Sequence, residues 1–204
     1  MTSFSTPITW QRPSMTQAAL APGGVVNGKP ASTRRLDDGC QDRVAASFEL
    51  MAALLAEVEL PEVLALVVRR AGLMARADLA FMALPGPGPN TLSIEVAAGA
   101  NADRIRGESV RVGTSVLGKV FMTGRPLALQ VATDAPLKGL PLPAGPILLL
   151  PLDTGERTCG VLALAGQSGN VSFTASVKRQ LRIFASTSAS MIEIAEERRG
   201  NHLG

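Results

Sequence analysis

Apolar residues recur at alternating spacings of four and three near both ends of the folded part of this 204-residue chain. This spacing gathers the apolar side chains on one face of an α-helix. The N-terminal series is Val44, Phe48, Met51, Leu55 and Val58. The C-terminal series lies within a helix predicted over 174–199 and comprises Val177, Leu181, Phe184, Met191 and Ala195, with the polar Ser188 at the one remaining position. Each apolar face packs either on a sheet or on the helices of a dimer. A repeat of three heptads or fewer is too short to distinguish these two kinds of packing. Both ends of the domain are predicted to be helical.

Between these helices the chain alternates between short apolar runs and turn residues, which predicts strands. The predicted strands are 79–84, 91–97, 109–112, 126–131, 146–152 and 158–165. A Pro/Gly-rich turn joins the first two and Asp153-Thr154-Gly155-Glu156 joins the last two, so each pair predicts a hairpin. A second helix opening at Pro61 precedes the strands, and a short helix over 114–122, capped by Thr114, interrupts them. The predicted fold class is mixed α/β (α+β).

Residues 1–40 differ in composition from the rest of the chain. They are rich in Pro, Ser, Thr, Gly and Asn without a sustained period, so they bury too little apolar area to offset the entropy of ordering them. We therefore predict a disordered tail over 1–40, one domain over 41–199 and a disordered C-terminus over 200–204. Hydrophobic residues make up 46% of the chain, which is sufficient for one substantial core.

Charge and cysteine content exclude several classes of protein. The formal net charge is only +3, and the cationic residues of the N-terminal 43 residues are dispersed, so neither a nucleic-acid nor a membrane partner is expected. No signal peptide or membrane-spanning stretch is evident. Cys40 and Cys159 lie too far apart for a disulfide framework or metal motif, which indicates a reducing compartment. The expected location is cytoplasmic.

The residues needed for catalysis are scarce. His202 is the sole histidine and stands third from the C-terminus, so neither a Ser/His or Cys/His pair, a zinc site nor histidine-ligated haem is expected. The segment from Gly113 to Lys119 matches the phosphate-loop pattern G-x-x-x-x-G-K but has Val120 where Ser or Thr should hold magnesium. No enzyme activity, metal or cofactor is predicted.

Three stretches resemble a GAF domain. Val112 to Val120, followed by Thr123-Gly124-Arg125-Pro126-Leu127, is similar to the family's G-x-x-G-x-V-x-x-x-G-x-P-x pattern, which accounts for the incomplete phosphate-loop motif. The sequence from Gly145 to Leu152 and then from Gly155 to Leu162 resembles the family's central hairpin, and Phe173-Thr174 with Leu181 and Phe184-Ala185 resembles its closing helix. The resemblance covers about 42–199. It implies an antiparallel sheet of about six strands, with the terminal helices on one face and a short helix and loops on the other.

More narrowly, the strand from Gly145 to Leu152 is similar to that in GAF domains of actinobacterial sensor histidine kinases of the dormancy-survival (DevS) type, particularly their second GAF domain. The resemblance implies a sensory or regulatory module of two-component signal transduction, whose partner is a sensor kinase or response regulator. The module either binds an unknown small ligand between the sheet and the loops 99–107 and 132–143, or acts as a dimeric signalling adaptor without a ligand. The pocket candidates are Phe81, Ile94, Val96, Val116, Phe121, Leu148, Leu150 and Cys159. A homodimer is expected through terminal-helix residues Val44, Phe48, Met51, Leu55, Leu181, Phe184 and Met191.

Departures from the family leave three interpretations open. The histidine by which GAF domains of these kinases bind haem is missing, and the sequence from Gly200 to Gly204 does not resemble a phosphoacceptor helix or an ATP-binding part. The chain therefore resembles either a module without its kinase transmitter or a truncated, non-functional kinase remnant. In the manner of GAF reductases, it could also be a thiol-dependent small-molecule enzyme with Cys159 as nucleophile.

Overall fold

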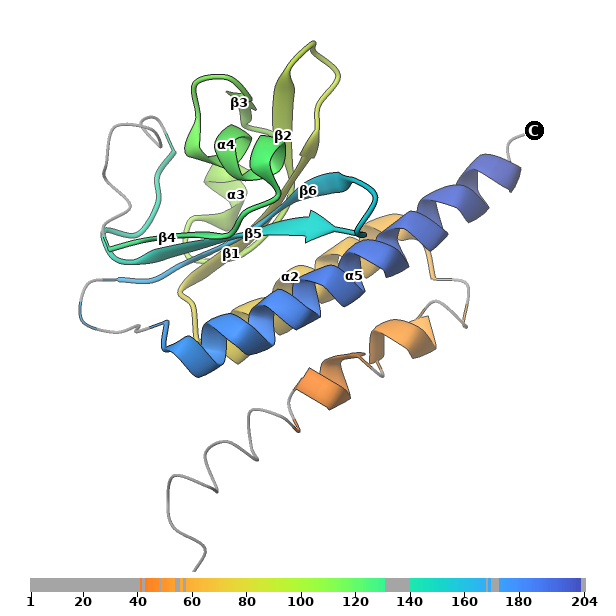
Figure 1. Ribbon diagram of the computed structural model, residues 1–204, viewed down its shortest axis with the longest axis horizontal. Coiled ribbons are helices and arrows are strands. Elements are labelled where there is room, and N and C mark those ends of the chain that lie inside the picture. Colours follow the sequence, from red (N-terminus) through yellow and green to blue (C-terminus); the bar gives the residue numbers. More distant parts are fainter. Residues whose placement is uncertain are drawn as a thin grey trace, which may run out of the picture.

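The computed structural model describes residues 41, 43–47, 49–53, 56, 58–130, 140–167, 169 and 173–202. The predicted tail over 1–40 therefore lies outside the described residues. A six-stranded antiparallel sheet with the order β3-β2-β1-β6-β5-β4 forms the centre of the domain (Figure 1). The prediction of a mixed helix and strand fold around a six-stranded sheet is confirmed.

All six strands form where the alternation of apolar runs and turns predicts them. They are β1 (Leu79–Pro85), β2 (Thr91–Gly99), β3 (Ser109–Arg111), β4 (Leu127–Leu129), β5 (Ile147–Asp153) and β6 (Thr158–Ala165). Their ends differ from the predicted ends by at most two residues. The two predicted hairpins, β1–β2 and β5–β6, both form, and β1 pairs with β6 to join them in one sheet.

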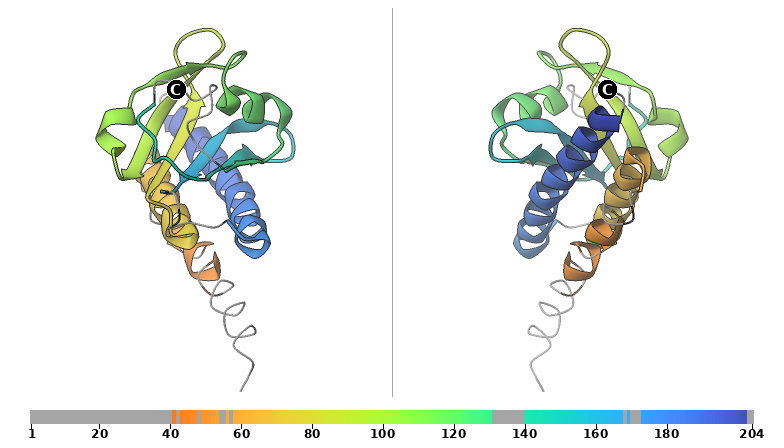
Figure 2. Two further views of the ribbon diagram at one scale, coloured as in Figure 1. Left: turned by 90° about the vertical axis from the view of Figure 1, so that its left-hand side faces the viewer. Right: turned by 90° about the vertical axis from the view of Figure 1, so that its right-hand side faces the viewer.

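Helices α2 (Leu60–Ala75) and α5 (Ala175–His202) lie side by side on one face of this sheet (Figures 1 and 2). Helix α2 begins as predicted, with Pro61 in its first turn, and it buries Val63, Leu64, Val67, Val68 and Ala71. Helix α5 continues past the predicted end at Arg199 and includes residues 200–202, which were expected to be disordered. No helix in the described parts of the chain is long and apolar enough to cross a membrane.

The opposite face of the sheet carries two short helices, α3 (Ala102–Ile105) and α4 (Val116–Thr123). Helix α4 was predicted, but its N-cap is Ser115 rather than Thr114, because the Ser115 hydroxyl accepts a hydrogen bond from the Gly118 N–H at 3.0 Å. Helix α3 was predicted as loop. Its four residues are too few to show a helical period, and a single buried side chain, Ile105, anchors it.

The sheet separates two apolar cores. Along β5, Leu148, Leu150 and Leu152 belong to the core on the side of α2 and α5, whereas Ile147 and Leu149 belong to the core on the side of α3 and α4. This is the alternation expected for a strand buried on both faces. We call the first core the helix-side core and the second the α4-side core. One strand therefore contributes to both layers of the domain.

Candidate functional site

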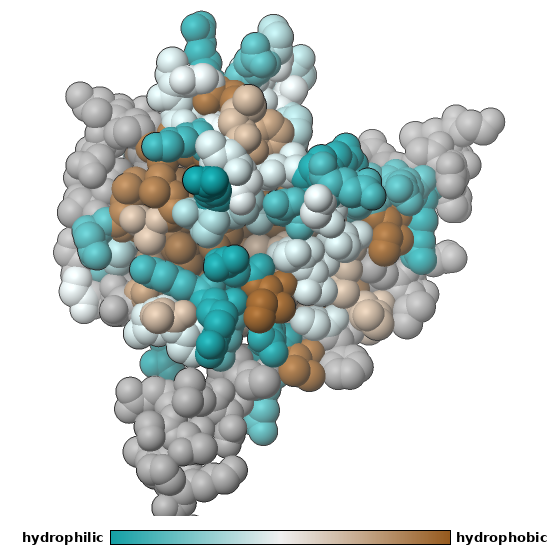
Figure 3. Space-filling view, in the orientation of Figure 1, coloured by the Kyte–Doolittle hydropathy of each residue, from teal (hydrophilic) through white to brown (hydrophobic). Residues whose placement is uncertain are grey.

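The α4-side core is the region in which the resemblance placed a ligand. Phe81 from β1, Ile94 from β2 and Leu117 from α4 are fully buried there. A partly buried apolar shell surrounds them and comprises Phe121, Leu127, Leu129, Leu140 and Leu142, among others. In Figure 3, apolar surface gathers over β4 on this side of the molecule. A ligand on this side would meet apolar side chains from α4, β4 and the segment before β5.

The eight predicted pocket residues do not lie together. Four belong to the α4-side core or pack against it: Phe81, Ile94, Val116 and Phe121. The other four face α2 and α5 across the sheet: Val96, Leu148, Leu150 and Cys159. The prediction of one pocket lined by all eight is therefore corrected. In β5 the residues that face α4 are Ile147 and Leu149. Each lies one position before a predicted pocket residue, Leu148 or Leu150.

A β-bulge explains why Ile94 and Val96 face opposite sides although they are two residues apart. Met82 pairs with Val96 while the next residue, Ala83, pairs with Ile94, so that Glu95 is the extra residue in β2. An extra residue reverses the alternation of faces beyond it. Leu92 and Ile94 consequently face α4, whereas Val96 and Ala98 face the helices.

The segment from Gly113 to Lys119 does not form a phosphate-binding loop. Val116, Leu117, Gly118 and Val120 are buried in α4, and Lys119 points outward and is exposed. A Cβ on Gly118 would lie 1.9 Å from the carbonyl oxygen of Val112. The second glycine of the motif is therefore required by the close approach of α4 to the preceding backbone, and no anion is needed to explain it.

Cys159 lies in β6, where its thiol donates a hydrogen bond to the carbonyl of Leu152 at 3.2 Å. Burial, and after it the negative charge of Glu196, raise the pKa of this thiol from 9.0 to about 11, and the nearby Arg157 lowers it only in part. Arg157 itself is held by Glu193 of α5, with Nη2 3.1 Å from Oε1. The thiol is therefore protonated near neutral pH, which disfavours a nucleophilic role.

The seven predicted dimer residues fall into two groups. Leu181, Phe184 and Met191 are buried in the helix-side core of their own chain. For these three residues the structure supports packing on the sheet rather than packing in a dimer. Val44 and Met51 are exposed, whereas Phe48 and Leu55 lie outside the described residues. The large apolar side chains that α5 exposes, among those whose burial the structure describes, are Ile183 and Ile194, which the sequence analysis missed. They are eleven residues apart, which is three helical turns, so they share one face.

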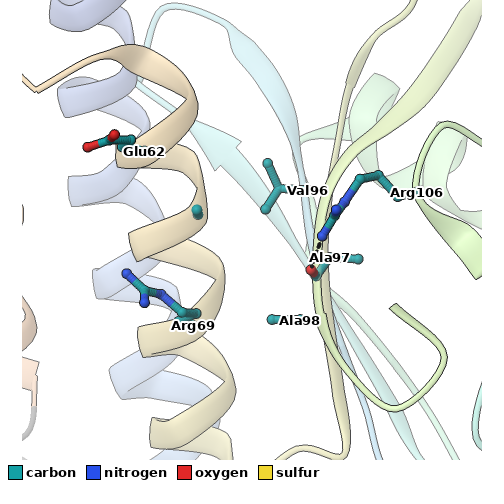
Figure 4. Close-up of a pocket in the computed structure, with 7 residues that line it drawn as sticks. Glu62, Arg69, Val96, Ala97, Ala98 and Arg106 are labelled. Carbon is teal, nitrogen blue, oxygen red and sulfur yellow. Dashed lines mark hydrogen bonds between the residues drawn. The ribbon is translucent and has the colours of Figure 1, made fainter. Parts of the chain in front are cut away.

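A groove between α2 and β2 was also missed by the sequence analysis. It consists of two adjoining hollows of about 380 Å³ and 480 Å³, which share Arg69 and Ala98. Figure 4 shows Glu62 and Arg69 leaving α2 on the same side, while Arg106 reaches the carbonyl of Ala97 at 3.1 Å. The sequence shows that Arg69 and Arg76 are seven residues apart, but it does not show that β2 lies beside them.

No group of three His, Cys, Asp or Glu able to hold a metal ion occurs within the described ranges.

A sheet with paired terminal helices on one face and a short capping helix on the other is the arrangement of a GAF domain, and the sequence model of this family matches residues 59–194. The chain belongs to the GAF domain family. Among solved structures it is similar to the GAF-B domain of DevS from Mycobacterium smegmatis, with 29% identity and a TM-score of 0.61 over 69% of this chain and 98% of that one. The predicted resemblance to the second GAF domain of DevS is confirmed.

Two more distant structures share the fold alone. The GAF domain of an Acinetobacter phosphoenolpyruvate-protein phosphotransferase has 16% identity and a TM-score of 0.66, covering 78% of this chain and 94% of its own. A free methionine-R-sulfoxide reductase from Neisseria meningitidis, solved with its substrate, has 13% identity and a TM-score of 0.61, covering 84% and 96%. A domain of a phosphotransferase and a reductase thus share the same architecture, and the fold does not by itself assign an activity.

Proposed function

We propose that the chain is a non-catalytic, cytoplasmic GAF sensory module of a two-component system, which acts as a dimer and responds to a small ligand in the α4-side core. Its output is the control of a sensor kinase or response regulator. The observation that carries the proposal is the double role of β5, in which Ile147 and Leu149 contact the α4-side core while Leu148 and Leu150 contact the terminal-helix layer. A displacement of β5 by a ligand would therefore reach the helices directly.

The β5–β6 hairpin is also tied to α5 by polar contacts. The Ser186 hydroxyl donates to the carbonyl of Asp153 at 3.2 Å, and Arg157 pairs with Glu193. These contacts lie at the two flanks of the turn between the strands. They support the proposal because they couple the hairpin to the helix that would transmit the signal.

The proposed dimer uses the outer face of α5. Ile183 is 48% exposed and Ile194 is 43% exposed, and Figure 3 shows separate apolar patches along the line of α5. Val44 and Met51, in the helical residues at the N-terminal end of the domain, add further exposed apolar surface. Apolar side chains spaced along terminal helices are suited to pairing with a second copy.

Sedimentation of the full chain and of Ile183→Lys and Ile194→Lys tests the dimer. We expect each substitution to raise the dimer dissociation constant about tenfold or more, because it places a charge in an apolar interface. Met122→Lys is the matched control, since Met122 is 71% exposed but lies on α4. A wild-type chain that stays monomeric at high concentration, or variants that dimerise like the control, would refute this interface.

Native mass spectrometry of the chain purified from its own host tests the ligand. We expect a dimer that carries a small-molecule mass, and Phe121→Ala should reduce the ligand-bound fraction severalfold. The adjacent Met122→Ala is the control, because Phe121 packs against the α4-side core while Met122 is exposed. Equal retention in both variants would place the ligand elsewhere, and absence of any bound mass would contradict the sensory role.

The alternative of a thiol-dependent enzyme is disfavoured by the raised pKa of Cys159. In a Cys40→Ala background, only Cys159 remains to react with a thiol reagent. We expect slow modification at pH 7.5. Rapid modification, together with a turnover that Cys159→Ala abolishes, would favour the enzyme instead.

A further inference from the structure

The larger hollow of the groove lies between α2 and the paired strands β1 and β2. Its floor is made of small side chains, among them Ala77, Ala80 and Ala98. Helix α2 approaches the sheet closely here, because a Cβ on Gly72 would lie 3.3 Å from the Cβ of Ala80. Small residues on both sides leave an open volume of about 480 Å³, which is within the range of small-molecule sites.

Two arginine residues line this hollow, and no Asp or Glu does. Arg69 and Arg76 both contribute to its wall, whereas Glu62 lines only the smaller neighbouring hollow. Neither arginine side chain forms an ion pair or hydrogen bond with another residue in the part of the chain that the structure describes. Arg106, by contrast, is held by the carbonyl of Ala97 and lies 4.0 Å from Asp103. The larger hollow is therefore the more electropositive of the two.

Arg76 occupies a backbone conformation that favours glycine. It is the C-cap of α2 with φ 50° and ψ 39°, in the left-handed region. Helices usually end there with Gly, since any side chain strains this conformation. The dipole of α2 favours a cation at this end only weakly. Arg76 therefore adds a second exposed positive charge to the wall that Arg69 lines, and neither charge has an ion-pair partner among the described residues.

We propose that this hollow binds a small organic anion, with its carboxylate or phosphate head at Arg69 and Arg76 and its apolar body on Val68, Ala80 and Ala98. Arginine binds such heads through paired, charge-assisted hydrogen bonds. The site is separate from the α4-side core, since it lies on the opposite face of the sheet. A ligand here contacts α2 directly, and α2 packs on α5.

Titration of the ¹⁵N-labelled full chain with phenyl phosphate, benzoate, inorganic phosphate and benzyl alcohol tests the site by amide shifts. Phenyl phosphate or benzoate should move the signals of Gly72, Ala98 and Gly99, and whichever binds more tightly identifies the preferred head. The better of the two should bind about tenfold more tightly than inorganic phosphate, because the ring is buried. Its affinity should also exceed that of benzyl alcohol about tenfold, because its head group is charged. Absence of shifts at these three residues, or equal binding of benzyl alcohol, would overturn the proposal.

Three variants separate the site from general charge effects. Arg69→Gln and Arg76→Gly should each weaken binding of the preferred probe about tenfold. Arg76→Gly should keep a Tm close to that of the wild type, because relief of backbone strain offsets the lost dipole interaction. Arg179→Gln removes an equal charge from exposed α5 and should leave the affinity unchanged. If Arg179→Gln weakens binding as much as Arg69→Gln, the anion is attracted by net charge alone and the site does not exist.

Discussion

Gly118 shows how strongly one residue can depend on its surroundings. Its ideal Cβ position is 1.9 Å from the carbonyl oxygen of Val112, a backbone atom that cannot move without displacing α4. We expect Gly118→Ala to lower the free energy of unfolding by about 3 kcal/mol or more, measured by urea denaturation.

Gly113, the first glycine of the same motif, is the matched control. A Cβ there meets nothing within 4 Å. Gly113→Ala should leave the free energy of unfolding nearly unchanged or raise it by about 0.5 kcal/mol, because alanine lowers the conformational entropy of the unfolded chain. Similar losses in both variants would show that the close approach of α4 to Val112 is not the cause.

Ser188 is fully buried in α5, and its hydroxyl has no hydrogen-bond partner among the described residues. Ser188→Ala should therefore stabilise the domain, by about 1 kcal/mol more than Ser190→Ala, since an unpaired buried hydroxyl is unfavourable. Ser190 is exposed in the same helix, so its substitution reports helix propensity alone. Chemical denaturation of both variants measures the difference, and an equal gain would indicate that the Ser188 hydroxyl is paired.

The Cys159 thiol makes stability depend on pH. Its pKa is about 11 in the folded chain against an ordinary value of 9.0, so the unfolded chain loses this proton first as pH rises. The contribution of the protonated thiol to the free energy of unfolding is fully present below about pH 9 and is lost as pH rises through about 11. The urea midpoint of the wild type should fall more between pH 8 and 11 than that of Cys159→Ala. Parallel pH profiles would show that the thiol is not shielded from water.

At the scale of single elements, the bulge in β2 decides which residues face which core. Deletion of Glu95 would make Ile94 and Val96 neighbours, so that both would keep their β1 partners and their opposite faces in a regular strand. We expect the free energy of unfolding to change by no more than about 1 kcal/mol, measured by urea denaturation. Glu95→Ala, which keeps the extra residue and changes only an exposed side chain, should stay within about 0.5 kcal/mol. A deletion variant that loses about 3 kcal/mol or more would show that the bulge itself is required.

At the scale of the whole domain, both cores share the same strands and should unfold together. Leu148 and Leu149 are adjacent and almost fully buried but lie in opposite cores. Each Leu→Ala substitution should cost about 2–5 kcal/mol and lower the midpoint of one common transition. Far-UV circular dichroism and methyl NMR signals from each core should give coincident curves. Separate midpoints for the two cores would show that they unfold independently, which would also weaken the proposed transmission through β5.

The elements themselves followed from local sequence. The six strands, α2, α4 and α5 formed where hydrophobic period and turn residues predicted them, because these signals act over a few neighbouring residues. The motif from Gly113 to Lys119 likewise indicated the family correctly. Helix α3 was missed because one buried side chain leaves no period.

The sites depended on contacts between distant segments. The bulge at Glu95 reversed the faces of β2, the phase of β5 placed Leu148 and Leu150 on the helix side, and the inner face of α5 packed on the sheet. The alternation of residues along a strand shows that its two faces differ. It does not show which face packs on the terminal helices and which packs on α4. The arginine groove likewise exists only where α2 meets β2. The sequence by itself determined the family and the order of elements through local periodicity, whereas the tertiary structure alone decided which side chains share a core, a surface or a groove.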